Sequence, residues 1–434
     1  MAAIEFTSTR LRVLVCAFAC AGDPSTKFFG GGDIMAWNLV KRLGGVHRLW
    51  VLTAAQNRDA LEAALKKEPL PRVEFHYVDL PGWLHPLLRH QGGLQFYAYL
   101  WQWKAYFVAR ELHQRVHFNA FHHLSYDNDW MASIIGALLP VPYLRGPGGG
   151  AHRTPKAFVR NYPLRERCWE RVRIIGQWLY RHDPFFVLGR RRAKAILVGN
   201  REALNAVPRK WQHKVKLFPL NGVSSVAFNG SPPKAQPKET YRILTAGRLV
   251  RLKAFDLAIE AFKTFVARTG LADRSDGVEL AIVGDGPELP RLRSLVGNYG
   301  LQERVRFETW KPQEELWSAM RACDVFLFPS LRDGGGLVVV EAMAAGKPVI
   351  CVDLGGPRMH VTEDCGVKVA PLSPEQVVGD LAAALERLYT DEELRLRLGK
   401  AARERAARLY HWDRLGERML EIYQDALGIQ QGEA

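Results

Sequence analysis

Short apolar runs alternate with longer stretches of helical spacing over most of the chain. Residues 12–19 and 241–246 are apolar almost throughout, which is typical of strands buried on both faces of a parallel sheet. Residues 34–43 have the periodicity of a helix, which Gly44 and Gly45 are expected to end. The alternation predicts an α/β fold built from doubly wound parallel sheets.

The length and one change in composition predict two domains. The chain has 434 residues, of which 47% are hydrophobic, enough for two separate cores. Residues 221–240 are rich in Pro, Ser, Gly and Lys, a composition typical of a linker. We therefore expect a boundary near residue 228, with Rossmann-like domains at 1–228 and 229–410.

The stretch 325–352 (VFLFPSLRDGGGLVVVEAMAAGKPVICV) reads as strand, glycine-rich loop, helix and strand. In an open parallel sheet this order presents loop amides and a helix N-terminus to an anionic ligand. Asp333 lies in the loop and Glu341 on the helix, a pair of carboxylates that suits a sugar attached to a diphosphate. The alternative is that Asp333 only caps the helix and Glu341 lies on a solvated face.

The same stretch resembles family 4 of the retaining, nucleotide-sugar-dependent glycosyltransferases. Residues 341–344 (EAMA) match the family pattern, whereas Asp333 replaces a Glu and Gly335 replaces an aromatic residue. The resemblance implies the GT-B fold, in which two Rossmann-like domains face each other across a cleft. It also implies that Glu341 holds ribose hydroxyls and Asp333 holds hydroxyls of the donor sugar. The loop and helix start, Gly335, Gly336 and Leu337, would then contact the donor.

Arg248 and Lys253 lie five positions apart across a strand–helix turn, so both can point at one diphosphate. The alternative is a solvated pair of cations. The spacing is similar to the pyrophosphate-binding pair of the family, in which Gly often stands where this chain has Ala254. In the family the loop holding Trp310 and Lys311 lies by the nucleobase, so both are candidates to contact it.

The first glycine loop of the chain, residues 28–33 (FFGGGD), follows the first predicted strand. Such a loop brings a backbone close to phosphate, and the resemblance assigns Gly31 and Gly32 to the donor. His122 and His123 lie near the end of another predicted strand. Family members carry a functional histidine there, and of the two we prefer His123.

Charge is concentrated in residues 152–194. The whole chain has a formal net charge of +15, and this segment has twelve Lys and Arg against three acids. With Trp169, Trp178 and Tyr180 among its cations, it suits an anionic membrane surface, an anionic acceptor or a nucleic acid. A solvated amphipathic face is the alternative.

The location expected for the chain is cytoplasmic, with peripheral contact at the inner face of a membrane. The six cysteines show no metal-ligand spacing and fit a reducing compartment. Residues 1–12 lack the order of a signal peptide, and no run reaches the roughly 18 apolar residues of a spanning helix.

The resemblance implies a retaining hexosyl transfer that requires neither a metal nor another cofactor. The sugar would move from a nucleotide diphosphate to a hydroxyl of a glycan or lipid-linked acceptor, in polysaccharide or glycolipid assembly. Asp127 and Asp129 form an Asp-x-Asp pair, interpreted as a polar loop. The family also implies that residues 411–434 form a helix crossing back to an acceptor-binding domain, 1–228, from the nucleotide-sugar-binding domain, 229–410.

Three alternatives remain open from the sequence. Another GT-B enzyme, such as a sugar epimerase or phosphorylase, would carry similar donor motifs. A donor-binding but inactive relative would explain Asp333 and Gly335. A nucleic-acid-binding protein would use the basic segment 152–194 but leave the donor motifs unexplained, so nucleic acid is the less favoured partner.

Overall fold

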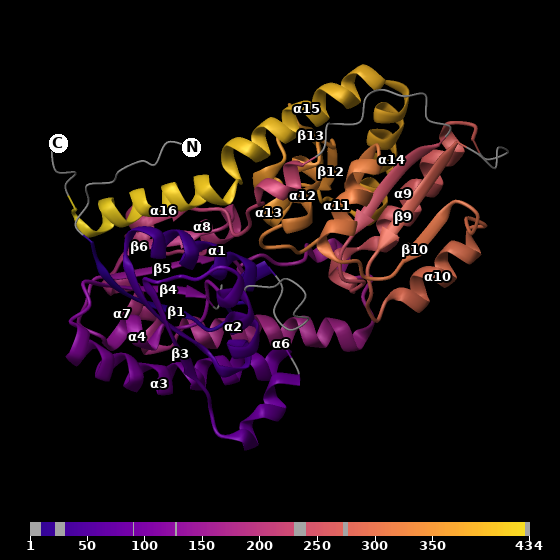
Figure 1. Cartoon of the computed structure of the whole chain (residues 1–434). Coiled ribbons are helices and arrows are strands. Elements are labelled where there is room, and N and C mark those ends of the chain that lie inside the picture. The colour runs from indigo at the N-terminus through magenta and orange to yellow at the C-terminus, as the bar shows by residue number, and fades with distance from the viewer. Residues whose placement is uncertain are drawn as a thin grey trace. The chain divides into compact units, whose positions relative to one another are not determined.

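The computed structural model describes residues 10–21, 31–89, 91–125, 128–229, 240–271 and 277–429. By their internal contacts the residues divide into two compact units (Figure 1). The N-terminal unit comprises residues 1–151, 168–220 and 412–434, and the C-terminal unit comprises 152–167 and 221–411. The change of unit falls at 220/221, ahead of the boundary expected near 228, and residues 230–239 of the predicted linker lie outside the described residues.

The N-terminal unit contains a seven-stranded parallel sheet with the order β3-β2-β1-β4-β5-β6-β7. Its strands are β1 (Arg12–Ala17), β2 (Arg48–Ala54), β3 (Val73–Val78), β4 (Ala120–Ser125), β5 (Tyr143–Gly148), β6 (Ala193–Val198) and β7 (Val215–Leu217). The strand order reverses between β1 and β4. In such sheets ligands bind at the carboxyl ends of the strands flanking this point.

Helices cover both faces of this sheet because neighbouring residues of a strand point to opposite faces. Val13 and Val15 pack in one core with α1 (Gly31–Val46) and α16 (Trp412–Leu427), whereas Leu14 packs in a second core with α3 (Gln91–Val116). The other elements of the unit are η1 (Ala55–Asn57), α2 (Arg58–Lys67), η2 (Gly82–Arg89), α4 (Ile134–Leu138), α7 (Pro184–Arg192), α8 (Arg201–Ala206) and η3 (Arg209–Lys214).

The C-terminal unit contains a six-stranded parallel sheet with the order β10-β9-β8-β11-β12-β13. Its strands are β8 (Tyr241–Ala246), β9 (Val278–Val283), β10 (Val305–Glu308), β11 (Val325–Phe328), β12 (Val349–Val352) and β13 (Gly366–Val369). Its helices are α5 (Lys156–Val159), η4 (Ser225–Phe228), η5 (Arg251–Lys253), α9 (Phe255–Arg268), α10 (Leu289–Asn298), α11 (Gln313–Ala322), α12 (Leu337–Ala344), α13 (Gly355–His360), α14 (Pro374–Thr390) and α15 (Glu392–Leu409). Helix α6 (Leu164–Arg181) begins in this unit and ends in the other.

One predicted helix end is wrong. Gly44 and Gly45 do not end α1, which continues to Val46. A Cβ atom on Gly44 would lie 2.4 Å from a methyl group of Val73. Gly44 is therefore needed for close packing of the helix on the sheet and does not act as a stop signal.

No helix in the described part of the chain is both long enough and apolar enough to span a bilayer.

Candidate functional site

The predicted donor residues of the C-terminal unit converge on the turn after β8 and the loop after β11. Lys253 ends η5, and the next residue, Ala254, has a left-handed backbone (φ 52°) that turns the chain into α9. The Lys253 ammonium forms an ion pair with Asp333 and lies 5.1 Å from the ring centroid of Phe328. The side chains of Lys253 and Asp333 are only 14% and 16% exposed, so the pair is largely shielded from water.

Asp333 has a second function besides this ion pair. Its Oδ1 accepts hydrogen bonds from the backbone N–H groups of Gly335 (3.1 Å) and Gly336 (2.7 Å), just before α12. Burial alone would raise the pKa of Asp333, but the charge of Lys253 and these hydrogen bonds lower it to about 2. Asp333 is therefore ionised at neutral pH, caps the loop and pairs with the lysine at the same time.

The backbone of the glycine loop is held by the start of α13, which the sequence did not identify. The N–H of Gly356 donates to the Asp333 carbonyl oxygen at 2.9 Å. A Cβ on Gly355 would lie 2.1 Å from that same oxygen, so only glycine fits there. His360 Nε2 lies 2.6 Å from the carbonyl oxygen of Gly335, and burial lowers the pKa of His360 to about 4. The neutral imidazole therefore donates this bond. The signal available in the sequence was a second glycine pair after a strand.

Glu341 lies inside the unit and not on a solvated helix face, with 3% of its surface exposed. Its Oε1 accepts hydrogen bonds from Gln313 Nε2 (2.8 Å) and Trp317 Nε1 (3.1 Å) of α11. Burial raises the pKa of Glu341 to about 7, although these two hydrogen bonds favour the charged form. Among the described residues, none donates to Oε2, so this oxygen is the one available to a ligand hydroxyl. Gln313 and Trp317 were not predicted.

Arg248 differs from Lys253, its predicted partner in phosphate binding. It is exposed, and no described acid forms an ion pair with it. The structure thus places one cation of the predicted pair against a carboxylate and leaves the other in solvent.

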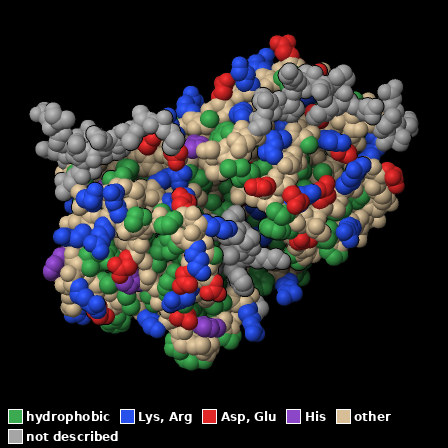
Figure 2. Space-filling model, viewed as in Figure 1, with side chains coloured by type: hydrophobic (Ala, Val, Ile, Leu, Met, Phe, Trp, Pro, Cys, Tyr) green, Lys and Arg blue, Asp and Glu red, His purple; other side chains and the backbone are tan. Residues whose placement is uncertain are grey.

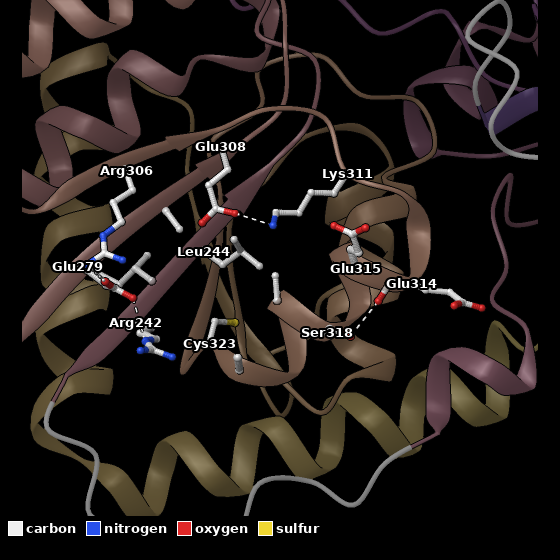
Figure 3. A pocket seen from close by; sticks show the side chains of 14 residues that line it. Arg242, Leu244, Glu279, Arg306, Glu308, Lys311, Glu314, Glu315, Ser318 and Cys323 are labelled. Carbon is white, nitrogen blue, oxygen red and sulfur yellow. Dashed lines mark hydrogen bonds and ion pairs between the residues drawn. The ribbon is translucent and has the colours of Figure 1, made fainter.

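The two residues predicted to contact a nucleobase point to different surroundings. Trp310 is half-exposed, and its backbone N–H donates to Asp285 Oδ2 at 3.0 Å. Lys311 forms a 2.8 Å ion pair with Glu308, whose hydrogen bond raises the pKa of Lys311. Both members of this pair line a groove of about 650 Å³ beside α11, over β8, β9 and β10 (Figure 3). Trp310 does not line that groove.

The groove in Figure 3 is charged on both walls. Glu279 lies between Arg242 (2.8 Å) and Arg306 (3.5 Å), opposite Lys311 and Glu308. Four acids (Glu279, Glu308, Glu314 and Glu315) line the groove against three cations (Arg242, Arg306 and Lys311), so it presents no surplus positive charge to a phosphate.

In the N-terminal unit, His122 is engaged on both ring nitrogens. Its Nδ1 lies 2.8 Å from the Tyr423 hydroxyl and its Nε2 lies 2.6 Å from the Gly146 carbonyl oxygen. Burial lowers the pKa of His122 to about 4, although the bond to Gly146 raises it in part. His122 is thus a neutral side chain that joins β4 to β5 and α16.

His123 has one nitrogen free for a ligand. Its Nδ1 lies 2.8 Å from Ser133 Oγ, and no residue in the described ranges bonds its Nε2. Burial, followed by the positive charge of Arg145, lowers the pKa of His123 well below its ordinary value. Of the two histidines, only His123 therefore retains a ring nitrogen without a partner among the described residues.

The other predicted residues of this unit are only partly described. Gly31 and Gly32 form the first turn of α1, whereas the preceding glycine of the loop lies outside the described residues. Asp127 also lies outside them. Asp129 is 3% exposed, and its nearest ion-pair partner is Arg181, at 3.8 Å. Asp129 is therefore buried near a cation and is not part of a polar surface loop.

Comparison with known proteins decides the family of the C-terminal unit. Residues 230–405 match the family model of glycosyl transferases group 1. These residues belong to that family. The match includes the predicted donor residues from Arg248 to Glu341, so the motif resemblance is confirmed at the level of a glycosyltransferase family.

Curated relatives of this glycosyltransferase domain are similar over part of their length. D-inositol 3-phosphate glycosyltransferase of Corynebacterium jeikeium (strain K411) is 34% identical over 196 residues, which cover 44% of this chain and 44% of that protein. Alpha-D-kanosaminyltransferase of Streptomyces kanamyceticus is 27% identical and covers 58% of this chain and 64% of that protein. The chain thus spans about half the length of the relatives it matches.

Solved structures extend the likeness to the whole fold. Sucrose-phosphate synthase from Thermosynechococcus elongatus has a TM-score of 0.66 at 20% identity and covers 96% of this chain and 100% of that chain. Anabaena Alr3699/HepE in complex with UDP and glucose has a TM-score of 0.60 at 17% identity and covers 96% of this chain and 100% of that chain. The two parallel sheets have the GT-B fold, as predicted.

Proposed function

We propose that this chain is a retaining glycosyltransferase that moves a sugar from a nucleotide-diphosphate sugar to a hydroxyl of a glycan or lipid-linked acceptor, in polysaccharide or glycolipid assembly. The observation that carries the proposal is the ion pair between Lys253 and Asp333, which joins the two predicted donor motifs inside a glycosyl transferases group 1 domain. An ionised carboxylate and a lysine at a glycine loop suit a sugar and a diphosphate respectively.

Each donor contact follows from the chemistry of the side chain. Arg248 and Lys253 bind the diphosphate, helped by the backbone N–H of Leu337 at the start of α12. The N–H groups of Gly335 and Gly336 hold Asp333 in the loop beside the donor. Asp333 accepts donor-sugar hydroxyls, and Glu341 accepts ribose hydroxyls through its Oε2. Trp310 and Lys311 are proposed to contact the base, and Gly31 and Gly32 the phosphate side of the donor.

The reaction proposed needs neither a metal nor another cofactor, because Arg248 and Lys253 neutralise the leaving diphosphate. The acceptor hydroxyl attacks the sugar from the face that the diphosphate leaves, and the leaving phosphate oxygen accepts its proton. The configuration of the sugar is thereby retained. His123, neutral at physiological pH, bonds a hydroxyl near the reacting carbon.

Binding of the donor is tested by thermal shift with UDP, GDP, ADP and their sugar conjugates, in EDTA and in Mg²⁺. A ligand that binds only the folded state raises Tm, so one nucleotide should raise it with or without Mg²⁺. Arg248→Ala should abolish the shift without lowering the Tm of the free protein, because Arg248 is exposed and forms no ion pair with a described acid.

The matched control is Arg397→Ala, an exposed arginine of α15 in the same unit, which should retain the shift. No shift with any nucleotide would contradict the proposal. A shift without sugar release to any hydroxyl acceptor would indicate a donor-binding but inactive relative.

A further inference from the structure

Helix α6 has its apolar residues on the side that faces solvent. Leu164, Val172, Ile175 and Leu179 recur at helical spacing with Cys168, so they form one stripe. These four apolar residues are 56–75% exposed, and Trp169 and Trp178, at the edges of the stripe, are 63% and 57% exposed. A surface helix of a globular protein normally buries such a stripe.

The opposite side of α6 is polar and lies against the protein. Gln177 is buried, with its amide 3.5 Å from the Gly150 carbonyl oxygen. Arg181 lies 3.8 Å from the buried carboxylate of Asp129. Further along the same side, the ring of Tyr180 packs on Tyr99 and Trp130. The orientation of α6 is thus fixed by polar and aromatic contacts, and the apolar stripe is left outside.

The charges on α6 are divided in the same way. Arg165 and Arg171 flank the exposed stripe. The acids lie on the other side: Glu166 pairs with Arg251 at 3.1 Å, and the Glu170 side chain is only 13% exposed. An apolar stripe with Trp at its edges, flanking Arg and no acid is the composition of a helix that lies in the interface of an anionic bilayer.

We propose that α6 is the element by which this protein docks on an anionic lipid bilayer. The helix lies parallel to the surface, with Leu164, Val172, Ile175 and Leu179 at the boundary of the acyl chains. Trp169 and Trp178 lie at the level of the headgroups, and the flanking arginines contact lipid phosphates. On the face drawn in Figure 2, hydrophobic side chains reach the surface among Lys and Arg side chains.

The docking surface rests on the proposed function for its purpose, because a lipid-linked acceptor would be found at that bilayer. The physical argument is independent of the donor, since α6 shares no residue with the predicted donor set. Vesicle binding without nucleotide and nucleotide binding without vesicles therefore test the two proposals separately.

The experiment is co-sedimentation of the full chain with vesicles of 30% phosphatidylglycerol in phosphatidylcholine, compared with phosphatidylcholine alone. The test variant is Val172→Ser/Ile175→Ser/Leu179→Ser, three exposed positions that leave the core intact. We expect wild type to bind the anionic vesicles and the triple variant to bind at least tenfold more weakly. The matched control, Leu372→Ser, removes another exposed leucine (70%) in the C-terminal unit and should bind as wild type does.

A second readout reports the depth of the helix. Cys168 is the one exposed cysteine of the six, so a polarity-sensitive fluorophore can be attached to it selectively. Its emission should shift to the blue with anionic vesicles. Absence of vesicle binding, or binding that the triple variant retains, would overturn the docking surface. Self-association through the stripe, in place of vesicle binding, would overturn it in favour of a second copy of the chain. In either case an intact nucleotide shift would leave the proposed function standing.

Discussion

Strands β4 and β11 occupy the same place in the two sheets, since each pairs with the first strand of its unit. Their use differs. On β4 the two histidines are part of the strand, and His122 is bonded on both nitrogens. After β11 the chain leaves the sheet as a glycine loop that carries Asp333, and the charge of Lys253 faces it.

The buried groups at the two strand ends also differ in their ionisation state. Burial lowers the pKa of His122 to about 4 and makes it neutral, whereas Lys253 and two loop amides keep Asp333 charged with a pKa of about 2. A neutral group can be bonded fully by the protein at little cost, but a buried charge is retained only with a compensating partner. Of the two strand ends, only that of β11 thus keeps a buried group in its charged form.

The largest effect is expected when the charge pair of the C-terminal unit is broken. Lys253→Ala leaves the Asp333 carboxylate without its cation and should reduce the free energy of unfolding by about 3 kcal/mol. Lys253→Ala/Asp333→Asn should recover part of this loss, because the neutral amide needs no counter-charge. Urea unfolding of the two single variants and the double variant measures the coupling. Additive losses would mean that the ion pair contributes nothing.

The second effect concerns the neutral histidine of the N-terminal unit. The pKa of His122 is about 4 in the folded state and about 6.5 when unfolded, so the unfolded state binds the proton first as pH falls. Stability present above pH 6.5 is lost towards pH 4, by about 3 kcal/mol for this residue. His122→Gln should lose about 3 kcal/mol less than wild type between pH 7 and pH 4 in urea unfolding. An equal loss of stability in wild type and variant would show that His122 is not kept neutral. Asp333 does not contribute in this window, since its stabilisation is lost only as pH falls from about 4 towards 2.

A third test concerns Glu341, the buried acid near its titration point. Its pKa is about 7 in the folded state and about 4.5 when unfolded, so between these values only the folded state holds the proton. The contribution of Glu341 to the free energy of unfolding is therefore lost as pH rises from 4.5 to 7. If the carboxylate binds ribose hydroxyls, nucleotide affinity should increase up to about tenfold from pH 6 to pH 8. Calorimetric titration at several pH values measures this. Glu341→Gln should bind weakly at every pH, and a pH profile that persists in this variant would assign the dependence elsewhere.

The smallest effect is local to the backbone. Ala254 has φ 52° between Lys253 and α9, a conformation that costs a residue with a Cβ about 1 kcal/mol. Ala254→Gly should therefore raise stability by up to about 1 kcal/mol in thermal unfolding. His117, with φ 54° after α3, is the matched position in the N-terminal unit, and His117→Gly should have a similar effect. A loss in both variants would show that the chain entropy of glycine dominates at these turns.

The sequence identified the local patterns correctly and missed contacts between distant segments. Arg248, Lys253, Asp333 and Glu341 were predicted because strand, glycine loop and helix follow one another within a few residues. The ion pair between Lys253 and Asp333 joins residues 80 positions apart, and no periodicity encodes which way two side chains turn. Trp317 on α11 was missed for the same reason, since it reaches Glu341 only after α11 packs beside α12.

The core of the N-terminal unit includes a helix made long after its strands. Met419 and Tyr423 of α16 pack on the sheet, and Tyr423 bonds His122, 301 residues earlier in the chain. At a synthesis rate of about 5–20 residues per second, some 15 to 60 seconds pass between translation of β4 and translation of α16. During that interval one apolar face of the first sheet lacks its final cover. The glycosyltransferase unit, which ends at His411, is therefore translated in full before the last helix of the sheet that precedes it.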